Sequence, residues 1–138
     1  MATIKAFEEI EAWQNARSLA QEIFELSCEG SFARDYKLRD QINGSSGSVM
    51  DNIAEGFERD GSKEFAQFLS IAKGSTGELR SQLYRSLDRN HIGERKFNDL
   101  KQKAMVISRQ ITGLISYLRR SEYKGVKYLK EPGNQPET

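Results

Sequence analysis

Residues 94–120 read ERKFNDLKQKAMVISRQITGLISYLRR, and this stretch decides the fold class of the 138-residue chain. Its apolar residues recur at steps of three and four, as they do along one face of an α-helix: Phe97, Leu100, Ala104, Ile107, Ile111, Leu114, Ile115 and Leu118. The two prolines, Pro132 and Pro136, both lie beyond it, so none interrupts the helical backbone here. The stretch therefore predicts a long helix with one buried stripe.

Three earlier stretches carry the same period, over residues 6–27, 35–58 and 62–89. Two of them contain a local conflict. Residues 43–48 read NGSSGS, which is poor helix because each glycine costs about 1 kcal/mol relative to alanine. Residues 75–78 read STGE and match a capping box, which would favour a new helix start. In both places the apolar stripe keeps its phase, so we predict one continuous helix through each.

Four helices of this length joined by short turns pack most simply as neighbours that alternate in direction. The sequence therefore predicts an all-α protein, a single-domain antiparallel up-down-up-down four-helix bundle over residues 1–120. Residues 121–138 read as a polar C-terminal tail. Its apolar residues, Tyr123, Val126, Tyr128 and Leu129, favour docking of the tail against the bundle or a neighbouring subunit. A free tail is the alternative.

Composition narrows the class of protein. With 37% hydrophobic and 30% charged residues, the chain has no apolar run long enough to span a membrane and no N-terminal secretory signal. Its single cysteine, Cys28, cannot form an internal disulfide, which suits a reducing, cytoplasmic location. The net charge of +1 is unevenly distributed, because residues 1–69 are net acidic and residues 70–138 net basic. We expect faces of opposite charge that suit packing between subunits.

No catalytic constellation is visible. A di-iron bundle needs two Glu-x-x-His pairs, whereas the only histidine is His91, preceded by Asp88. We expect His91 to be a solvated turn residue. Cys28 lies near Glu25 and Glu29, which disfavour a reactive thiolate. Nucleotide-binding and nucleophile-elbow motifs are absent from the sequence. The sequence therefore predicts a protein that is not an enzyme and has no cofactor and no metal.

A polar strip lies on the second predicted helix, where Asn52, Glu55 and Arg59 share one side. One interpretation is structural, with hydrogen bonds that tie this helix to the next. The other is a binding role.

A basic row is predicted on the outer face of the last helix. At about 100° per residue, Arg95, Arg109 and Arg120 project within roughly 40° of one another, opposite the apolar stripe. Lys101 and Lys103 lie at its margins, and Lys124 would extend it. Arginine donates two parallel hydrogen bonds to a phosphate, and few aromatic residues interleave the row. The row thus indicates RNA or DNA binding with weak sequence preference; a merely solvated face is the alternative.

Several motifs resemble a known family. Residues 52–56 read NIAEG, followed by Arg59, SKEF at 62–65, FL at 68–69, IAKGS at 71–75 and EL at 78–79. Earlier landmarks are WQNA at 13–16 and LRDQI at 38–42. Over about residues 5–120 these motifs resemble the four-helix-bundle proteins encoded in 23S-rRNA intervening sequences. That family includes the accessory variability proteins of diversity-generating retroelements. One departure is NGSSG at 43–47, where the family usually has an arginine-rich helix.

The resemblance implies a non-enzymatic homo-oligomer, a pentameric ring with a basic surface and nucleic acid as favoured partner. It also implies a reverse transcriptase as partner in retroelement members. The alternative function is a protein-interaction scaffold, for example an accessory subunit to a reverse transcriptase or another acidic protein. A monomer with a solvated acidic face is the alternative to the oligomer.

Overall fold

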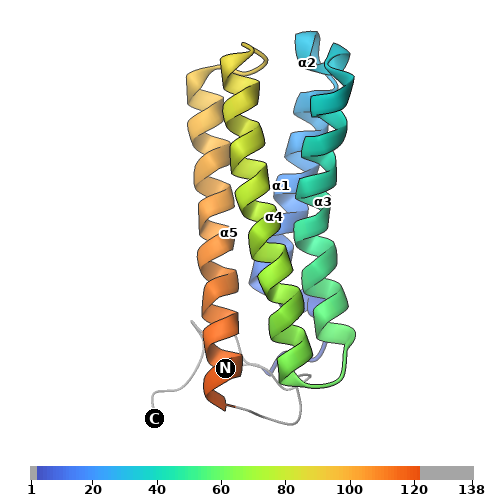
Figure 1. Ribbon diagram of the computed structural model, residues 1–138, viewed down its shortest axis with the longest axis vertical. Coiled ribbons are helices and arrows are strands. Elements are labelled where there is room, and N and C mark those ends of the chain that lie inside the picture. Colours follow the sequence, from blue (N-terminus) through green and yellow to red (C-terminus); the bar gives the residue numbers. More distant parts are fainter. Residues whose placement is uncertain (1–2, 122–138) are drawn as a thin grey trace.

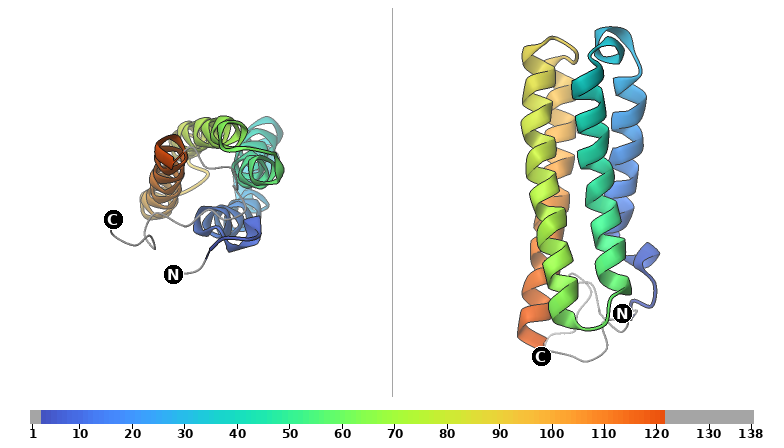
Figure 2. Two further views of the ribbon diagram at one scale, coloured as in Figure 1. Left: turned by 90° about the horizontal axis from the view of Figure 1, so that it is seen from below. Right: turned by 45° about the vertical axis from the view of Figure 1, so that its right-hand side comes forward.

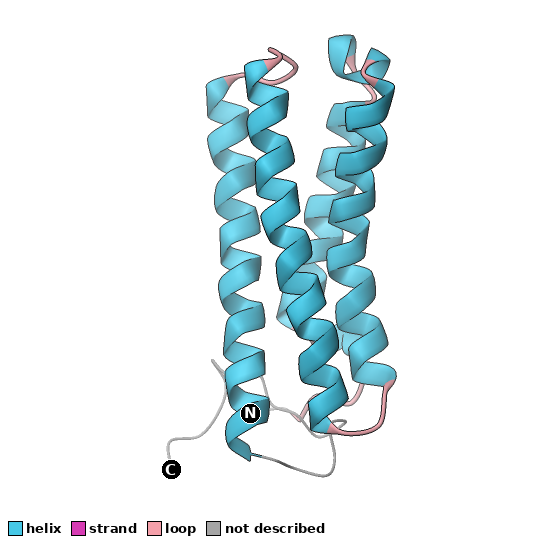
Figure 3. Ribbon diagram, viewed as in Figure 1, coloured by secondary structure: helices cyan, strands magenta, loops and turns pink. Residues whose placement is uncertain are grey.

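The structure of the chain is a computed structural model that describes residues 3–121. Its helices, in chain order, are the 3-10 helix η1 (Phe7–Glu9), α1 (Glu11–Ser27), α2 (Gly30–Arg34), α3 (Tyr36–Glu58), α4 (Ser62–Asp88) and α5 (Glu94–Ser121). The described residues form no strand (Figure 3). The long helices α1, α3, α4 and α5 alternate in direction and pack side by side (Figure 1). This arrangement confirms the predicted all-α four-helix bundle.

The four long helices surround one core. Helix α3 packs between α1 and α4, and α5 packs on α4 and closes the bundle against α1 (Figure 2). Each long helix contributes an apolar stripe to the centre, although Phe24, which the period of the first helix predicts on its stripe, is 53% exposed. Fully buried examples are Ile23 on α1, Ile42 on α3, Leu79 on α4 and Leu100 on α5. The charged residues are left outside, where they form the faces described below.

The predicted first helix, residues 6–27, is wrong at its start. Ile10 is extended, with φ −75° and ψ 122°, and it separates η1 from α1. This break lets Ile10 enter the core with no exposed surface, while Phe7 packs edge-to-face on Trp13 with ring centroids 5.1 Å apart. The helical period alone predicts one unbroken helix through Ile10. In the structure, burial of the extended Ile10 takes precedence over continuing the helix.

Helix α2 was not predicted from the sequence. It is one turn long and begins at Gly30, whose φ of +56° suits glycine. Its Phe32 is buried and covers that end of the core. A five-residue helix carries too few residues to show a period, which explains why the pattern missed it.

The serine- and glycine-rich segment at residues 43–48 is helical, as predicted. Asn43 Nδ2 donates to the Arg39 carbonyl at 2.8 Å and to Ser27 Oγ of α1 at 2.9 Å. Ser75 Oγ of α4 donates to Ser48 Oγ of α3 at 2.9 Å. Small side chains let α1 and α4 approach α3 closely here, and hydrogen bonds pair the polar atoms that this contact encloses.

Helix α4 runs unbroken through residues 75–78, as the stripe predicted. Ser75, the N-cap position of the capping-box match, donates through Oγ to Ser48 of α3, and Thr76 Oγ1 donates to the Lys73 carbonyl of the preceding turn, so neither caps a new helix start. The turn before α4 places Gly61 at φ +100°, a conformation that favours glycine. Next to this turn, Gly56 of α3 lies directly against Phe65 and Phe68 of α4. The α3–α4 hairpin is therefore closely packed at its turn end.

Candidate functional site

The predicted arginine row lies on the outer face of α5. Arg95, Arg109 and Arg120 are all exposed, opposite the buried stripe of the same helix. Within residues 3–121, none of the three has an acidic partner; the Arg120 guanidinium lies over the Tyr117 ring at 6.0 Å. Their spacing along the helix is about 21 Å and then about 17 Å, at 1.5 Å per residue. The three arginines therefore form an exposed row, but they lie far apart along the helix.

Lys101 and Lys103 do not extend this row outward. Lys103 Nζ lies 2.9 Å from Glu22 Oε1 of α1 and 3.2 Å from Asp99 Oδ2. Its hydrogen bond with Glu22 raises the pKa of the Lys103 ammonium, with Asp99 adding to the effect. Lys101 Nζ donates to Tyr84 Oη of α4 at 3.0 Å. Both lysines therefore bind neighbouring helices, a role the sequence could not show because it depends on which helices flank α5.

The remaining predicted basic residue, Lys124, lies outside the described residues, as does the tail at 121–138 apart from Ser121, which ends α5. The predicted docking of the tail stays a prediction.

The polar strip of Asn52, Glu55 and Arg59 makes its hydrogen bonds within α3. Asn52 Nδ2 donates to the Ser48 carbonyl and to Ser48 Oγ, both at 2.9 Å. Arg59 and Glu55 form an exposed ion pair at 2.7 Å. The prediction that this strip ties α3 to α4 by hydrogen bonds is wrong, because the contact to α4 is the Arg59 guanidinium over the Phe68 ring at 4.9 Å.

His91 corrects a second expectation. It is not solvated: its side chain is 8% exposed, and its ring stacks on Phe32 of α2 with centroids 5.0 Å apart. One ring nitrogen, Nε2, lies 2.8 Å from Asp35 Oδ2, and Nδ1 lies 2.8 Å from Ser31 Oγ. Arg89 also reaches Asp35 at 2.9 Å. The loop before α5 folds over α2 and so buries a histidine that the sequence suggests is exposed. His91 thereby joins a hydrogen-bonded cluster, here called the clasp, that consists of Ser31, Asp35, Arg89 and His91.

The clasp of Ser31, Asp35, Arg89 and His91 has a structural role. Hydrogen bonds from His91 and then from Arg89 lower the pKa of the Asp35 carboxyl to about 2. Asp35 Oδ1 also accepts from the backbone N–H of Leu38 and so caps α3. These contacts join α2, the start of α3 and the loop before α5 at one end of the bundle.

Three further features of the described residues bear on function: clusters that could bind a metal, the cysteine, and the apolar length of the helices. Across residues 3–121 no three histidine, cysteine or acidic side chains come together where they could hold a metal ion. Cys28 is exposed at the end of α1 and is not in a disulfide. Among the described helices, none is long and apolar enough to cross a membrane.

Three further cations belong with the basic row and were missed from the sequence. Lys63 and Lys73 lie on α4 and Arg119 on α5, and all three are exposed. They come together with Arg120 because α4 and α5 are antiparallel, which brings the start of one helix beside the end of the other (Figure 1). This grouping depends on the pairing of two helices, so it does not follow from the charges of either helix alone.

Comparisons with known proteins bear on the fold and the family. The sequence model of a family described as 23S rRNA-intervening sequence protein matches residues 8–113. A search of curated proteins found no match. Among solved structures, a protein of unknown function from the S23 ribosomal protein family of Bacteroides thetaiotaomicron has a similar fold, with a TM-score of 0.69. The two are 17% identical, and the likeness covers 75% of this chain and 97% of that chain.

Proposed function

This chain belongs to the family of 23S rRNA-intervening sequence proteins, and on that basis we propose that it is a non-enzymatic homo-oligomer that binds nucleic acid through a basic surface. The observation that carries the proposal is the set of exposed arginines on α5 that have no acidic partner within residues 3–121. The proposed partner is RNA or DNA with weak sequence preference, because the row carries cations rather than aromatic platforms.

The contrast with neighbouring lysines supports this role. Lys96 and Lys103 of α5 both contact Glu22 at the surface of the bundle, and Lys103 also contacts Asp99, so carboxylates partly balance their charge. Arg95 and Arg109 face away from α1 and have no such carboxylate. An uncompensated guanidinium is the group that pairs most readily with a phosphate.

Repetition of the surface would offset its sparseness. Three contacts per chain bind weakly, but copies of the same row on a ring engage one long strand together, so that their effective concentration raises the overall affinity. The net acidic N-terminal half and net basic C-terminal half of the chain offer complementary faces for such assembly. A pentamer is the assembly we favour.

The purified protein is expected to behave as an oligomer, with a mass of about 78 kDa for a pentamer of the 15.7 kDa chain. Size exclusion coupled to light scattering at micromolar concentration measures this mass. Raising the salt concentration serves as a control for contacts between oppositely charged faces, which it should weaken. A mass of one chain at low salt would contradict the oligomer.

Charge reversal of Arg95→Glu together with Arg109→Glu is expected to lower the affinity for RNA and DNA about tenfold at low salt. It should also reduce the slope of log affinity against log salt by about 1.4–1.8, since each of the two lost phosphate contacts removes about 0.7–0.9. Fluorescence anisotropy of labelled oligonucleotides at several salt concentrations measures both quantities.

The matched control is Arg34→Glu with Lys37→Glu, which reverses two exposed cations near the start of α3. This control should bind like the parent. If both double variants lose affinity equally, binding reflects only net charge and the proposal fails. If the parent binds no nucleic acid but captures an acidic protein such as a reverse transcriptase, the scaffold function replaces it.

A further inference from the structure

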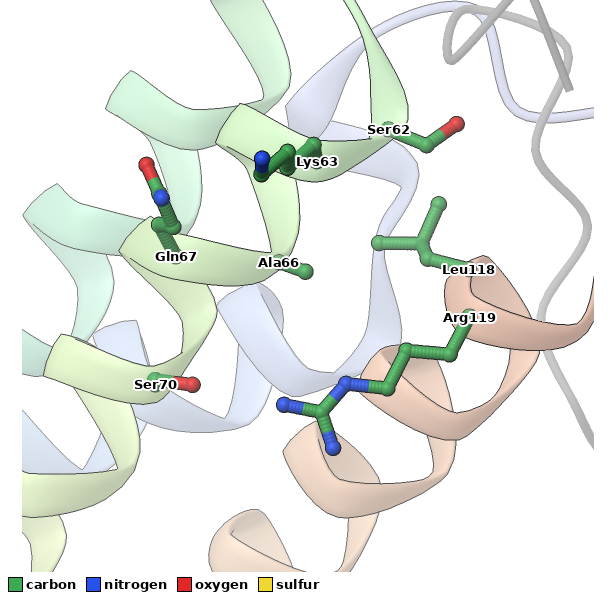
Figure 4. Close-up of a pocket in the computed structure, with 7 residues that line it drawn as sticks. All are labelled: Ser62, Lys63, Ala66, Gln67, Ser70, Leu118 and Arg119. Carbon is green, nitrogen blue, oxygen red and sulfur yellow. The ribbon is translucent and has the colours of Figure 1, made fainter. Parts of the chain in front are cut away.

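Two adjoining hollows form a groove between α4 and α5. They lie in the half of the bundle where α4 begins and α5 ends, and Figure 1 shows the course of these two helices. The hollows have volumes of about 580 and 780 Å³ and share Ser70 and Arg119 in their walls. Figure 4 shows the first hollow, with Lys63, Ala66 and Ser70 on α4 and Leu118 and Arg119 on α5. The Arg119 side chain extends from α5 toward α4.

The charge of the groove is of one sign. Among the described residues, its lining has four cations, Lys63 and Lys73 from α4 and Arg119 and Arg120 from α5, and no aspartate or glutamate. Within residues 3–121, Lys63, Lys73 and Arg119 have no hydrogen bond or ion pair. Four cations held close together without counter-charges repel one another, and a bound anion would relieve that repulsion.

The walls of the second hollow carry small residues beside the buried Ile115. Its α4 side includes Ser70 and Gly74, and its α5 side includes Thr112 and Ser116. At Gly74 a Cβ atom would meet nothing within 4 Å, so the space beside this backbone is open. Within the described part of the chain, the Ser70 and Ser116 hydroxyls have no partner and can donate to a phosphate oxygen.

We propose that this groove binds the sugar–phosphate backbone of single-stranded nucleic acid. The groove lies between two helices whose packed axes are about 8–10 Å apart, and a duplex, which is wider than its own major groove of roughly 12 Å, cannot enter it. A duplex therefore rests on the rims, whereas a single phosphodiester chain enters. Within residues 3–121 the lining contains no aromatic ring, so bases do not stack on this part of the groove and we expect recognition independent of sequence.

The groove narrows the proposed nucleic-acid partner to a single strand, so this inference rests on the proposed function. The two surfaces share Arg120 but otherwise use different residues. Lys73 and Arg119 lie in the groove, whereas Arg95 and Arg109 lie outside its lining. The two surfaces can thus be removed separately.

The test compares two double variants. One combines Lys73→Glu and Arg119→Glu in the groove, and the other combines Arg95→Glu and Arg109→Glu in the arginine row. The probes are a labelled 20-nucleotide oligouridine and a 20-base-pair RNA duplex, with anisotropy measured between 50 and 200 mM salt. The groove variant is expected to lose at least tenfold in affinity for the single strand and less than threefold for the duplex. Its salt slope for the single strand should fall by about 1.4, at about 0.7 per contact.

A second variant blocks the groove without changing charge. Gly74→Leu places a bulky side chain in the open space while favouring the helix. It should reproduce the selective loss of single-strand binding, and circular dichroism and light scattering should match the parent. Equal losses on single strand and duplex, or no loss with Gly74→Leu, would overturn the groove.

The remaining outcomes separate this site from the proposed function. Parent binding to duplex but not to the single strand would refute the groove and leave nucleic-acid binding intact. Binding of inorganic polyphosphate without single-strand binding would identify a different phosphate chain as the ligand and likewise refute it. A parent that binds neither nucleic acid would refute both proposals.

Discussion

Gly56→Ala is expected to destabilise the bundle by about 2 kcal/mol, because α3 and α4 meet at this glycine without room for a side chain. A Cβ atom at residue 56 would lie 2.7 Å from Phe68 Cβ and 3.0 Å from Phe65 Cδ1. Phe68 Cβ is fixed to the α4 backbone, so relief requires the two helices to separate. Separation would in turn disturb the edge-to-face pair of Phe57 and Phe65, whose centroids are 5.8 Å apart.

The matched control is Gly44→Ala, on the same helix. No atom lies within 4 Å of a Cβ atom at residue 44, so alanine there should stabilise the protein by about 0.5–1 kcal/mol through its higher helix propensity. Thermal or urea unfolding followed by circular dichroism should show shifts of opposite sign. Stabilisation by both substitutions would mean that α3 and α4 do not approach closely at Gly56.

His91→Ala is expected to lower stability by about 2–3 kcal/mol, the second large effect. The substitution removes the ring stacked on Phe32 and leaves the Asp35 carboxylate and the Ser31 hydroxyl without their imidazole partner. Chemical unfolding measures the loss. His91→Phe, which retains a ring on Phe32 but no polar atom, should fall between the parent and alanine.

Acid unfolding gives an independent readout of the same clasp. The folded-state pKa of Asp35 is lowered to about 2 from an ordinary value of 3.8. Its contribution to stability is therefore complete above about pH 4 and is lost as the pH falls through about 2. In His91→Ala this acid-dependent part should shrink. Asp88→Ala, an exposed position, serves as control, and if it matched His91→Ala in both measurements the clasp would have no special role.

The apolar stripes were sufficient to predict the four long helices, because each stripe must face a common core. They even outweighed NGSSGS at 43–48 and the capping-box match at 75–78, where local propensity argued the other way. What they could not give was the extended Ile10 or the single turn of α2, since neither is long enough to have a period.

The candidate site was predictable only on one helix at a time. The exposure of Arg95, Arg109 and Arg120 follows from their angle relative to the stripe of α5. The engagement of Lys103 with Glu22, and of His91 with Asp35, joins residues 81 and 56 positions apart. Such pairs depend on which helices become neighbours, and Lys63, Lys73 and Arg119 were missed for the same reason.

The closure of the bundle between its first and last long helices has a consequence for how the chain folds. Helix α3 packs on α4, and α4 packs on α5. Each of these pairs is joined by a short loop, so its contacts cost little loop-closure entropy. The α1–α5 seam is different: the Asn15–Gln110 hydrogen bond joins residues 95 positions apart. The other pairs of long helices, α1 with α3 included, meet across short connections, so we expect the α1–α5 seam to close last, since its loop-closure entropy is the largest.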